Sequence, residues 1–89
     1  MSVEYLKVDV KVCKELGFGA AILLAYLCYV SKTLPKDSCG YFALDSSFSA
    51  TVGMDRDKMR YYRDKLATKG IISYIPGRNH NAKPRYKLL

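Results

Sequence analysis

The chain has 89 residues, which is enough for one small domain, and we expect residues 1–89 to form that domain. A composition of 49% hydrophobic and 12% aromatic residues excludes a disordered chain and provides a core without disulfides or a metal. The formal net charge of +7 lies entirely in the C-terminal part: residues 1–54 carry five lysines and five acids, whereas residues 55–89 carry ten Lys or Arg and three acids. Such a one-sided basic surface is typical of proteins that bind phosphate-rich partners, and it also fits an acidic protein surface.

Three cysteines, Cys13, Cys28 and Cys39, are present without a CxxC spacing. Their odd number favours free thiols in a reducing, intracellular compartment, so we expect a cytoplasmic protein. The apolar run AAILLAYLCYV, which begins at Ala20, follows a lysine and a glutamate and is too short to cross a bilayer. It predicts a buried helix.

The N-terminal third predicts a strand and two helices. Residues 5–10, YLKVDV, alternate and include β-branched side chains, which favours a short strand. Asp9 is placed to cap a short helix, VKVCKEL, that stops at Gly17. From Gly19 to about Lys32 apolar residues occupy nearly every helical face, so we expect a central helix surrounded by the rest of the domain.

The middle of the chain predicts a loop, an extended segment and a short helix. LPKDSCG holds turn-forming residues and predicts the loop, and the aromatic YFAL after it is expected to be extended. Asp45 or Ser46 can cap a helix over residues 46–53, SSFSATVG, which is too short to be stable without a packing neighbour. Gly53 is expected to end this helix in a left-handed turn.

A longer basic helix is predicted to begin after a cap at Asp55 and to end at Thr68, just before a Lys-Gly pair. Met59, Tyr62 and Leu66 fall at i, i+3 and i+7, which gives a narrow apolar stripe that can dock on the central helix. The opposite face of this helix then carries charged side chains toward solvent.

The C-terminal segment predicts a β-hairpin. IISYI, residues 71–75, and RYKLL, residues 85–89, are strand-like and flank the turn-rich PGRNHNAKP. Tyr74 and Tyr86 can pair across the two strands. Since RYKLL completes the hairpin as the sequence ends, we expect either a fragment or a complete small protein, with no dimerisation helix after the hairpin.

Two short helices, a Gly-Met-Asp turn between them and a hairpin after them form a helix-turn-helix with a wing. The segment FALDSSFSATVGMDRDKMRYYRDKLATKGIISY resembles the winged helix-turn-helix domains of bacterial transcription regulators and, more closely, those of phage and plasmid replication proteins. The resemblance implies an α+β fold with a three-helix core and a C-terminal β-hairpin wing. It departs at Arg63, where such domains often have an aliphatic residue.

The resemblance further implies double-stranded DNA binding, with the helix from Asp55 to Thr68 in the major groove and with replication-origin binding or transcription regulation in a bacterial or phage-infected cell as the role. Arg56 and Arg60 are the expected base contacts, because an arginine fork can bind guanine O6 and N7 together. Tyr61 can contact sugar, phosphate or a thymine methyl. The candidate DNA-binding residues are Arg56, Asp57, Lys58, Arg60, Tyr61, Arg63, Asp64 and Lys65 on the helix, and Arg78, Asn79, Lys83 and Arg85 on the wing.

Other classes of function find little support in the sequence. His80 is the single histidine, so a chain has no histidine-paired nucleophile and no multi-histidine metal site. Asp57 and Asp64 are better explained as ion partners of neighbouring arginines than as metal ligands, and no glycine-rich phosphate loop is present. We therefore expect no enzymatic activity, metal, cofactor, small-molecule substrate or membrane partner.

Two hypotheses about the partner stay open. One winged domain reads only a few base pairs, so selective DNA binding needs a homodimer, a tandem site or a larger parent protein. The alternative is a phage-type winged-helix module that binds a protein, because fold does not fix function. Such a module would inhibit or recruit a host nucleic-acid enzyme through the same basic face.

Overall fold

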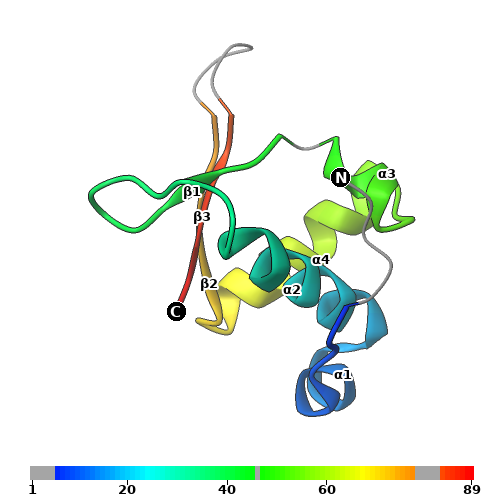
Figure 1. Cartoon of the computed structure of the whole chain (residues 1–89). Helices are drawn as coiled ribbons and strands as arrows, with labels where there is room; N and C mark the ends of the chain where they lie inside the picture. Colours follow the sequence, from blue (N-terminus) through cyan, green and yellow to red (C-terminus); the bar gives the residue numbers. More distant parts are fainter. Residues whose placement is uncertain (1–5, 46, 78–82) are drawn as a thin grey trace.

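The structure is a computed structural model that describes residues 6–45, 47–77 and 83–89 (Figure 1). Four helices and three strands are found in these residues, and the three strands form an antiparallel sheet, which confirms the expected α+β class. In chain order the elements are α1 (Val10–Leu16), α2 (Phe18–Ser31), β1 (Phe42–Ala43), α3 (Phe48–Thr51), α4 (Arg56–Thr68), β2 (Ile72–Ile75) and β3 (Arg85–Leu88).

Helix α2 runs through the middle of the molecule, as its all-round apolar sequence predicts (Figure 1). Leu23 and Leu27 are fully buried on it, and so are Met59 and Leu66 of α4. The apolar stripe of α4 therefore docks on α2 as expected. Tyr62, the third member of the stripe, is half-buried, and its ring lies over the backbone of Gly19.

The sheet has the strand order β1-β3-β2, so β3 is the central strand. Tyr86 of β3 pairs with Phe42 on one side and with Tyr74 on the other. The predicted hairpin and the predicted Tyr74–Tyr86 pair are thus confirmed, and the extended segment after the loop adds the third strand. Because the Tyr86 side chain is fully buried under the helices, the sheet and the helices share one core.

The caps predicted at Asp9 and Asp55 are confirmed. The Asp9 carboxylate accepts hydrogen bonds from the backbone N–H groups of Lys11 and Val12, at 2.9 and 3.3 Å. The Asp55 carboxylate accepts one from the N–H of Lys58 at 2.8 Å. Each carboxylate satisfies donors that the first helical turn leaves free, which explains why α1 and α4 begin where they do.

Two predicted elements differ from the structure. The strand expected over residues 5–10 is wrong in its described part, because Asp9 turns the chain into α1 and residues 6–9 pair with no strand of the sheet. Helix α3 spans four residues, fewer than the eight expected. The N-cap of α3 is Ser47, so the cap expected at Asp45 is wrong: the Asp45 carboxylate accepts from the N–H of Ser47 and forms a turn before the helix. Ser46 lies outside the described residues.

Candidate nucleic-acid interface

A tight turn joins α3 to α4 and sets their relative direction. Gly53 has φ 73°, the left-handed region that the sequence predicted for it. The N–H of Gly53 donates to the carbonyl of Ala50 at 3.2 Å, and the N–H of Met54 donates to that of Ser49 at 2.9 Å. This pair of bonds is the Schellman end of a helix, and Asp55 starts the next helix immediately after it.

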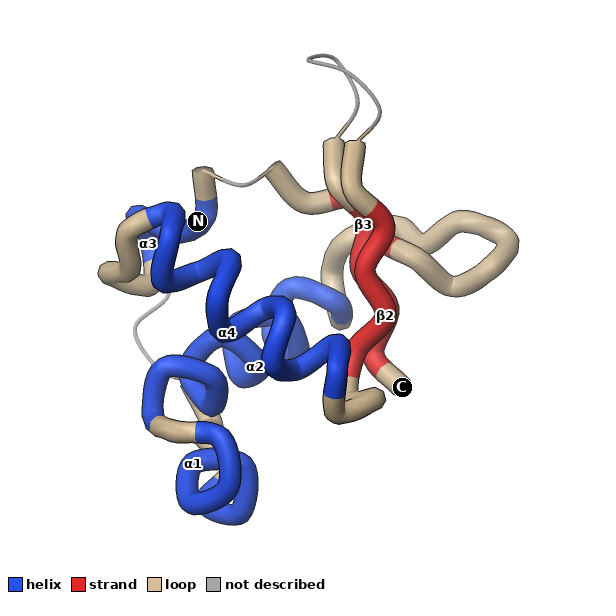
Figure 2. Tube along the Cα trace, turned by 180° about the vertical axis from the view of Figure 1, so that it is seen from behind, coloured by secondary structure: helices blue, strands red, loops and turns tan. Residues whose placement is uncertain are grey.

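The face of α4 opposite the apolar stripe is exposed, as expected. Successive helical residues are about 100° apart, so positions midway between Met59 and Leu66 on the far side of the helix point to solvent. The side chains that the sequence assigned to this face, Arg56, Asp57, Arg60, Tyr61 and Asp64, are all exposed, and so is the phosphate-binding candidate Lys58. Tyr61 is 56% exposed, although it is a large aromatic residue. In Figure 2 α4 lies in front of α2, so this face is open.

This outward face carries both signs of charge. Arg56, Lys58 and Arg60 supply three cations in the first turns of α4, and Asp57 and Asp64 add two carboxylates. Asp64 lies 3.5 Å from Arg63 and is the ion partner that the sequence predicted. Asp57 forms no ion pair with any of the described residues, so the predicted pairing of Asp57 with a neighbouring arginine is wrong among these residues.

Lys65 and Lys69 extend the cationic surface toward α1. The Lys65 ammonium donates to the carbonyl of Leu16 at 3.4 Å and lies 4.9 Å from the centre of the Tyr61 ring. With Lys69, these residues line a shallow hollow of about 260 Å³ between α1 and α4. The sequence prediction missed Lys69, although its spacing of four residues from Lys65 places both lysines on the same side of the helix.

Arg63 does not join the exposed cations, which corrects its expected place among the phosphate-binding residues. Its side chain is only 13% exposed. The guanidinium carbon lies 4.0 Å from the centre of the Tyr74 ring in β2. Position 63 is next to the buried stripe on the helix surface, and β2 covers that side of α4, so the side chain is turned onto the sheet.

Two of the four residues predicted on the hairpin, Lys83 and Arg85, lie among the described residues. Lys83 is exposed and comes two residues before β3, at the end of the hairpin remote from the turn that joins α4 to β2. Arg85 donates to the Asp37 carboxylate at 3.4 Å, so an acid of the loop before β1 partly neutralises it. Arg78, Asn79 and the single histidine, His80, lie outside the described residues.

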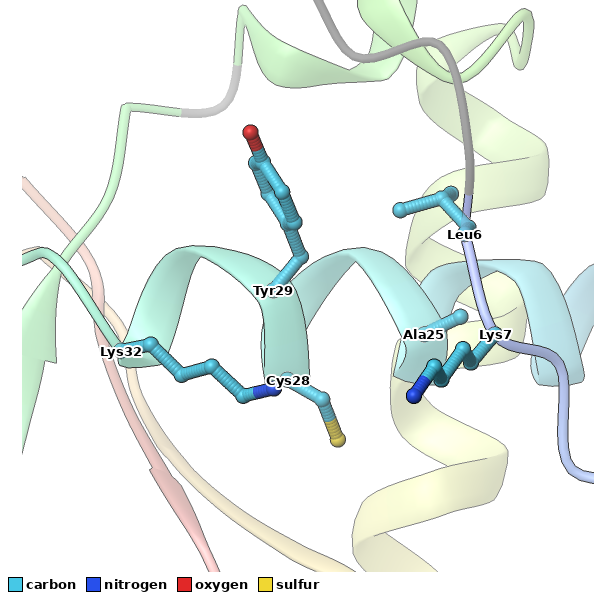
Figure 3. A pocket seen from close by; sticks show the side chains of 6 residues that line it. All are labelled: Leu6, Lys7, Ala25, Cys28, Tyr29 and Lys32. Atoms are coloured by element: carbon cyan, nitrogen blue, oxygen red, sulfur yellow. The ribbon is translucent and has the colours of Figure 1, made fainter.

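A larger hollow lies on the other side of α2. It has a volume of about 430 Å³ and is lined by Leu6, Lys7, Ala25, Cys28, Tyr29 and Lys32. Figure 3 shows α4 behind α2 in this view, so Lys32 is a surface cation on the face of α2 away from α4. It offers a matched control for charge removal on the candidate interface. Burial raises the pKa of the Cys28 thiol in this hollow, which keeps the thiol protonated.

No group of three or more His, Cys, Asp or Glu side chains that could hold a metal ion occurs in residues 6–45, 47–77 and 83–89. In the same residues no helix has both the length and the apolar character needed to cross a bilayer.

The chain was compared with protein families, curated proteins and solved structures. No protein-family model matches the chain. No curated protein matches it either. The solved structures likewise yield no match.

Proposed function

We propose that the protein binds double-stranded DNA, with α4 in the major groove and the β2–β3 hairpin as a wing. The observation that carries this proposal is the two-sidedness of α4. Met59 and Leu66 fix one side of the helix to the core, while Arg60 on the other side and Arg56 in the first turn are exposed to solvent. A helix seated in this way can enter a major groove without unfolding any other part of the molecule.

The arrangement around α4 supports the proposal. Helix α3, the Gly53 turn and α4 follow one another as the two helices of a helix-turn-helix do. The order β1-β3-β2 is compatible with a winged-helix layout, since it places the hairpin directly after α4 and lets it extend past the helices (Figure 2). Binding by α4 and by Lys83 at once would require a duplex that reaches from the outward face of α4 to the far end of the hairpin.

Exposed arginines in the first turns of α4 suit base contact. An arginine presents a planar fork of N–H donors, and guanine presents two acceptors at matching distance in the major groove. Lys58, Lys65 and Lys83 are suited to phosphates, which fix the register but carry no sequence information. The affinity should then depend strongly on salt, because each neutralised phosphate releases condensed counterions.

The test is a salt titration of binding to a fluorescent duplex of random sequence. We expect log K to fall linearly with log salt, with a slope of roughly −0.9 for each phosphate that is contacted. Lys83→Ala should make the slope shallower by about one unit and weaken all sequences alike. Lys32→Ala removes the same charge from the far face of α2 and should leave the slope nearly unchanged.

Arg60→Ala tests base contact. On duplexes selected from a random pool, this substitution should cost about 1 to 3 kcal/mol of binding free energy and relax the preference at one base position. An unchanged affinity and an unchanged base preference would remove Arg60 from the interface. The symmetry of the selected sites would also show whether one or two protein chains bind.

The carboxylates of Asp57 and Asp64 favour one alternative. They lie on the exposed face of α4, where they would repel phosphates and could pair with basic side chains of a protein. In that case α4 binds a protein surface of mixed charge, such as that of a nucleic-acid enzyme. If no duplex binds even in dilute buffer, the DNA proposal fails and this alternative remains.

A further inference from the structure

The contact between Arg63 and Tyr74 joins the exposed helix to the hairpin. The central carbon of the Arg63 guanidinium, in the middle of α4, lies over the Tyr74 ring at 4.0 Å from the ring centre. A cation at this distance from an aromatic face is attracted by the ring's negative charge density, and the attraction grows when water is excluded. The Arg63 side chain is only 13% exposed, so most of the water has been excluded.

Tyr74 transmits this contact to the central strand. Its ring lies 5.1 Å from the ring of Tyr86, its cross-strand neighbour in β3. Tyr86 is fully buried and also contacts the rings of Phe42 and Phe48, at 6.1 and 6.2 Å between centres. The guanidinium is therefore in contact with a row of aromatic rings that continues into the core.

No strong ion pair draws Arg63 away from the ring. Its nearest carboxylate, on Asp64, is 3.5 Å away and mostly exposed, which makes that pair weak. The Arg63 Nε and the Tyr86 hydroxyl are buried without a hydrogen-bond partner among the described residues. Burial raises the pKa of Tyr86 to about 12, so this hydroxyl stays neutral at pH 7 and does not neutralise the arginine.

The contact between Arg63 and Tyr74 lies where it can affect the angle between α4 and the hairpin. The chain passes from α4 to β2 through residues 69–71, a short turn about which the hairpin could pivot. Arg63 lies more than one turn before the end of α4, and Tyr74 lies in the third position of β2. The buried side chains of Ile72 and Tyr86 attach the hairpin to the core. The contact between Arg63 and Tyr74 adds a direct attachment between α4 and β2.

We propose that Arg63 is a positioning residue that holds the β2–β3 hairpin at a fixed angle to α4. The part of this proposal that concerns DNA rests on the proposed function: a fixed angle lets helix and wing reach one duplex together without an ordering cost at binding. Arg63 does so by contact with Tyr74, and it does not touch the nucleic acid. An aliphatic residue at this position would fill the space but would lack the directional attraction to the ring.

The angle can be measured in the free protein by NMR residual dipolar couplings from the amides of α4 and of β2 and β3. In the wild type we expect both elements to fit a single alignment tensor. In Arg63→Met, which keeps an unbranched apolar stem but removes the guanidinium and its charge, the hairpin should fit a separate, weaker tensor. Tyr74→Leu should reproduce this loss, and Tyr74→Phe, which retains the ring, should not.

A single shared tensor in both Arg63→Met and Tyr74→Leu would overturn the proposal. Circular dichroism shows whether each variant is folded. If Arg63→Met fails to fold, then Tyr74→Leu, which leaves α4 intact, decides the question, and Arg63→Lys, which keeps the charge without the planar fork, is expected to give an intermediate alignment.

Duplex binding separates this proposal from the proposed function. Lys83→Ala should weaken binding in the wild-type background and should have little further effect in Arg63→Met, because a hairpin that is not held contributes little. If the wild type binds no duplex, the DNA function fails while the alignment data still decide the role of Arg63. Equal effects of Lys83→Ala in both backgrounds would contradict the positioning role in binding.

Discussion

Replacing Gly19 with alanine tests how closely α4 packs on α2. A Cβ at Gly19 would overlap the ring of Tyr62, with the ring atom Cδ2 only 2.8 Å away, whereas carbon atoms pack best at about 3.5 to 4.0 Å. The half-buried ring can swing outward to relieve this overlap, and it then loses its contact with α2. Gly19 has no positive φ, so the substitution does not strain the backbone.

The expected size of the effect is a difference between two opposing contributions. A tyrosine buries roughly 200 Å² in a protein core, so exposing about 80 Å² more of Tyr62 costs about 2 kcal/mol at roughly 25 cal/mol per Å². Alanine is up to about 1 kcal/mol better than glycine in a helix. Gly19→Ala should therefore lower the free energy of unfolding by about 1 kcal/mol.

The sign of this effect should reverse when the ring is absent. In a Tyr62→Ala background nothing opposes the new methyl group, and Gly19→Ala should raise the free energy of unfolding by up to about 1 kcal/mol through helix propensity alone. Urea unfolding followed by circular dichroism at 222 nm measures the free energy of unfolding of the wild type, the two single variants and the double variant. The packing of Tyr62 on Gly19 would be refuted if Gly19→Ala lowered the free energy of unfolding equally in both backgrounds. It would also be refuted if Gly19→Ala raised that free energy in the wild-type background.

Three further predictions concern the stability of the fold. Leu66→Ala should lower the free energy of unfolding by about 3 kcal/mol, because Leu66 is fully buried between α4 and α2, and urea unfolding measures this loss. Asp55→Ala should cost about 1 kcal/mol in the same assay through loss of the cap on α4, while Asp55→Ser should retain most of it. The backbone N–H of Tyr41, helped by other donors including Arg85, holds the pKa of the Asp37 carboxyl below its usual value. Its stabilising effect is therefore present above the unfolded-state pKa near 4 and is lost as pH falls through the lower folded-state pKa. The wild type should exceed Asp37→Asn in stability at pH 7, and thermal melts in a descending pH series should show that difference shrinking in acid; a constant difference would contradict this.

Features that depend on neighbours along the chain were predictable from the sequence. The caps at Asp9 and Asp55 and the turn at Gly53 were placed correctly, because a helix end is decided by hydrogen bonds within four residues of it. The hairpin was predictable from two strand-like runs around a turn-rich segment. The exposure of Arg60 and Asp64 followed from the position of the apolar stripe alone, given the period of the helix.

Features that depend on distant partners were decided by the tertiary structure. Arg63 lies at the edge of the apolar stripe, where the helix period allows either exposure or burial, and only β2, with Tyr74, turned it inward. The ion pair of Arg85 with Asp37 joins residues 48 positions apart, and no local pattern indicates it. The sequence by itself determined where the helices and the hairpin form and which side of α4 faces water. The tertiary structure decided which cations stay exposed, because an edge position is buried only by whatever packs beside it.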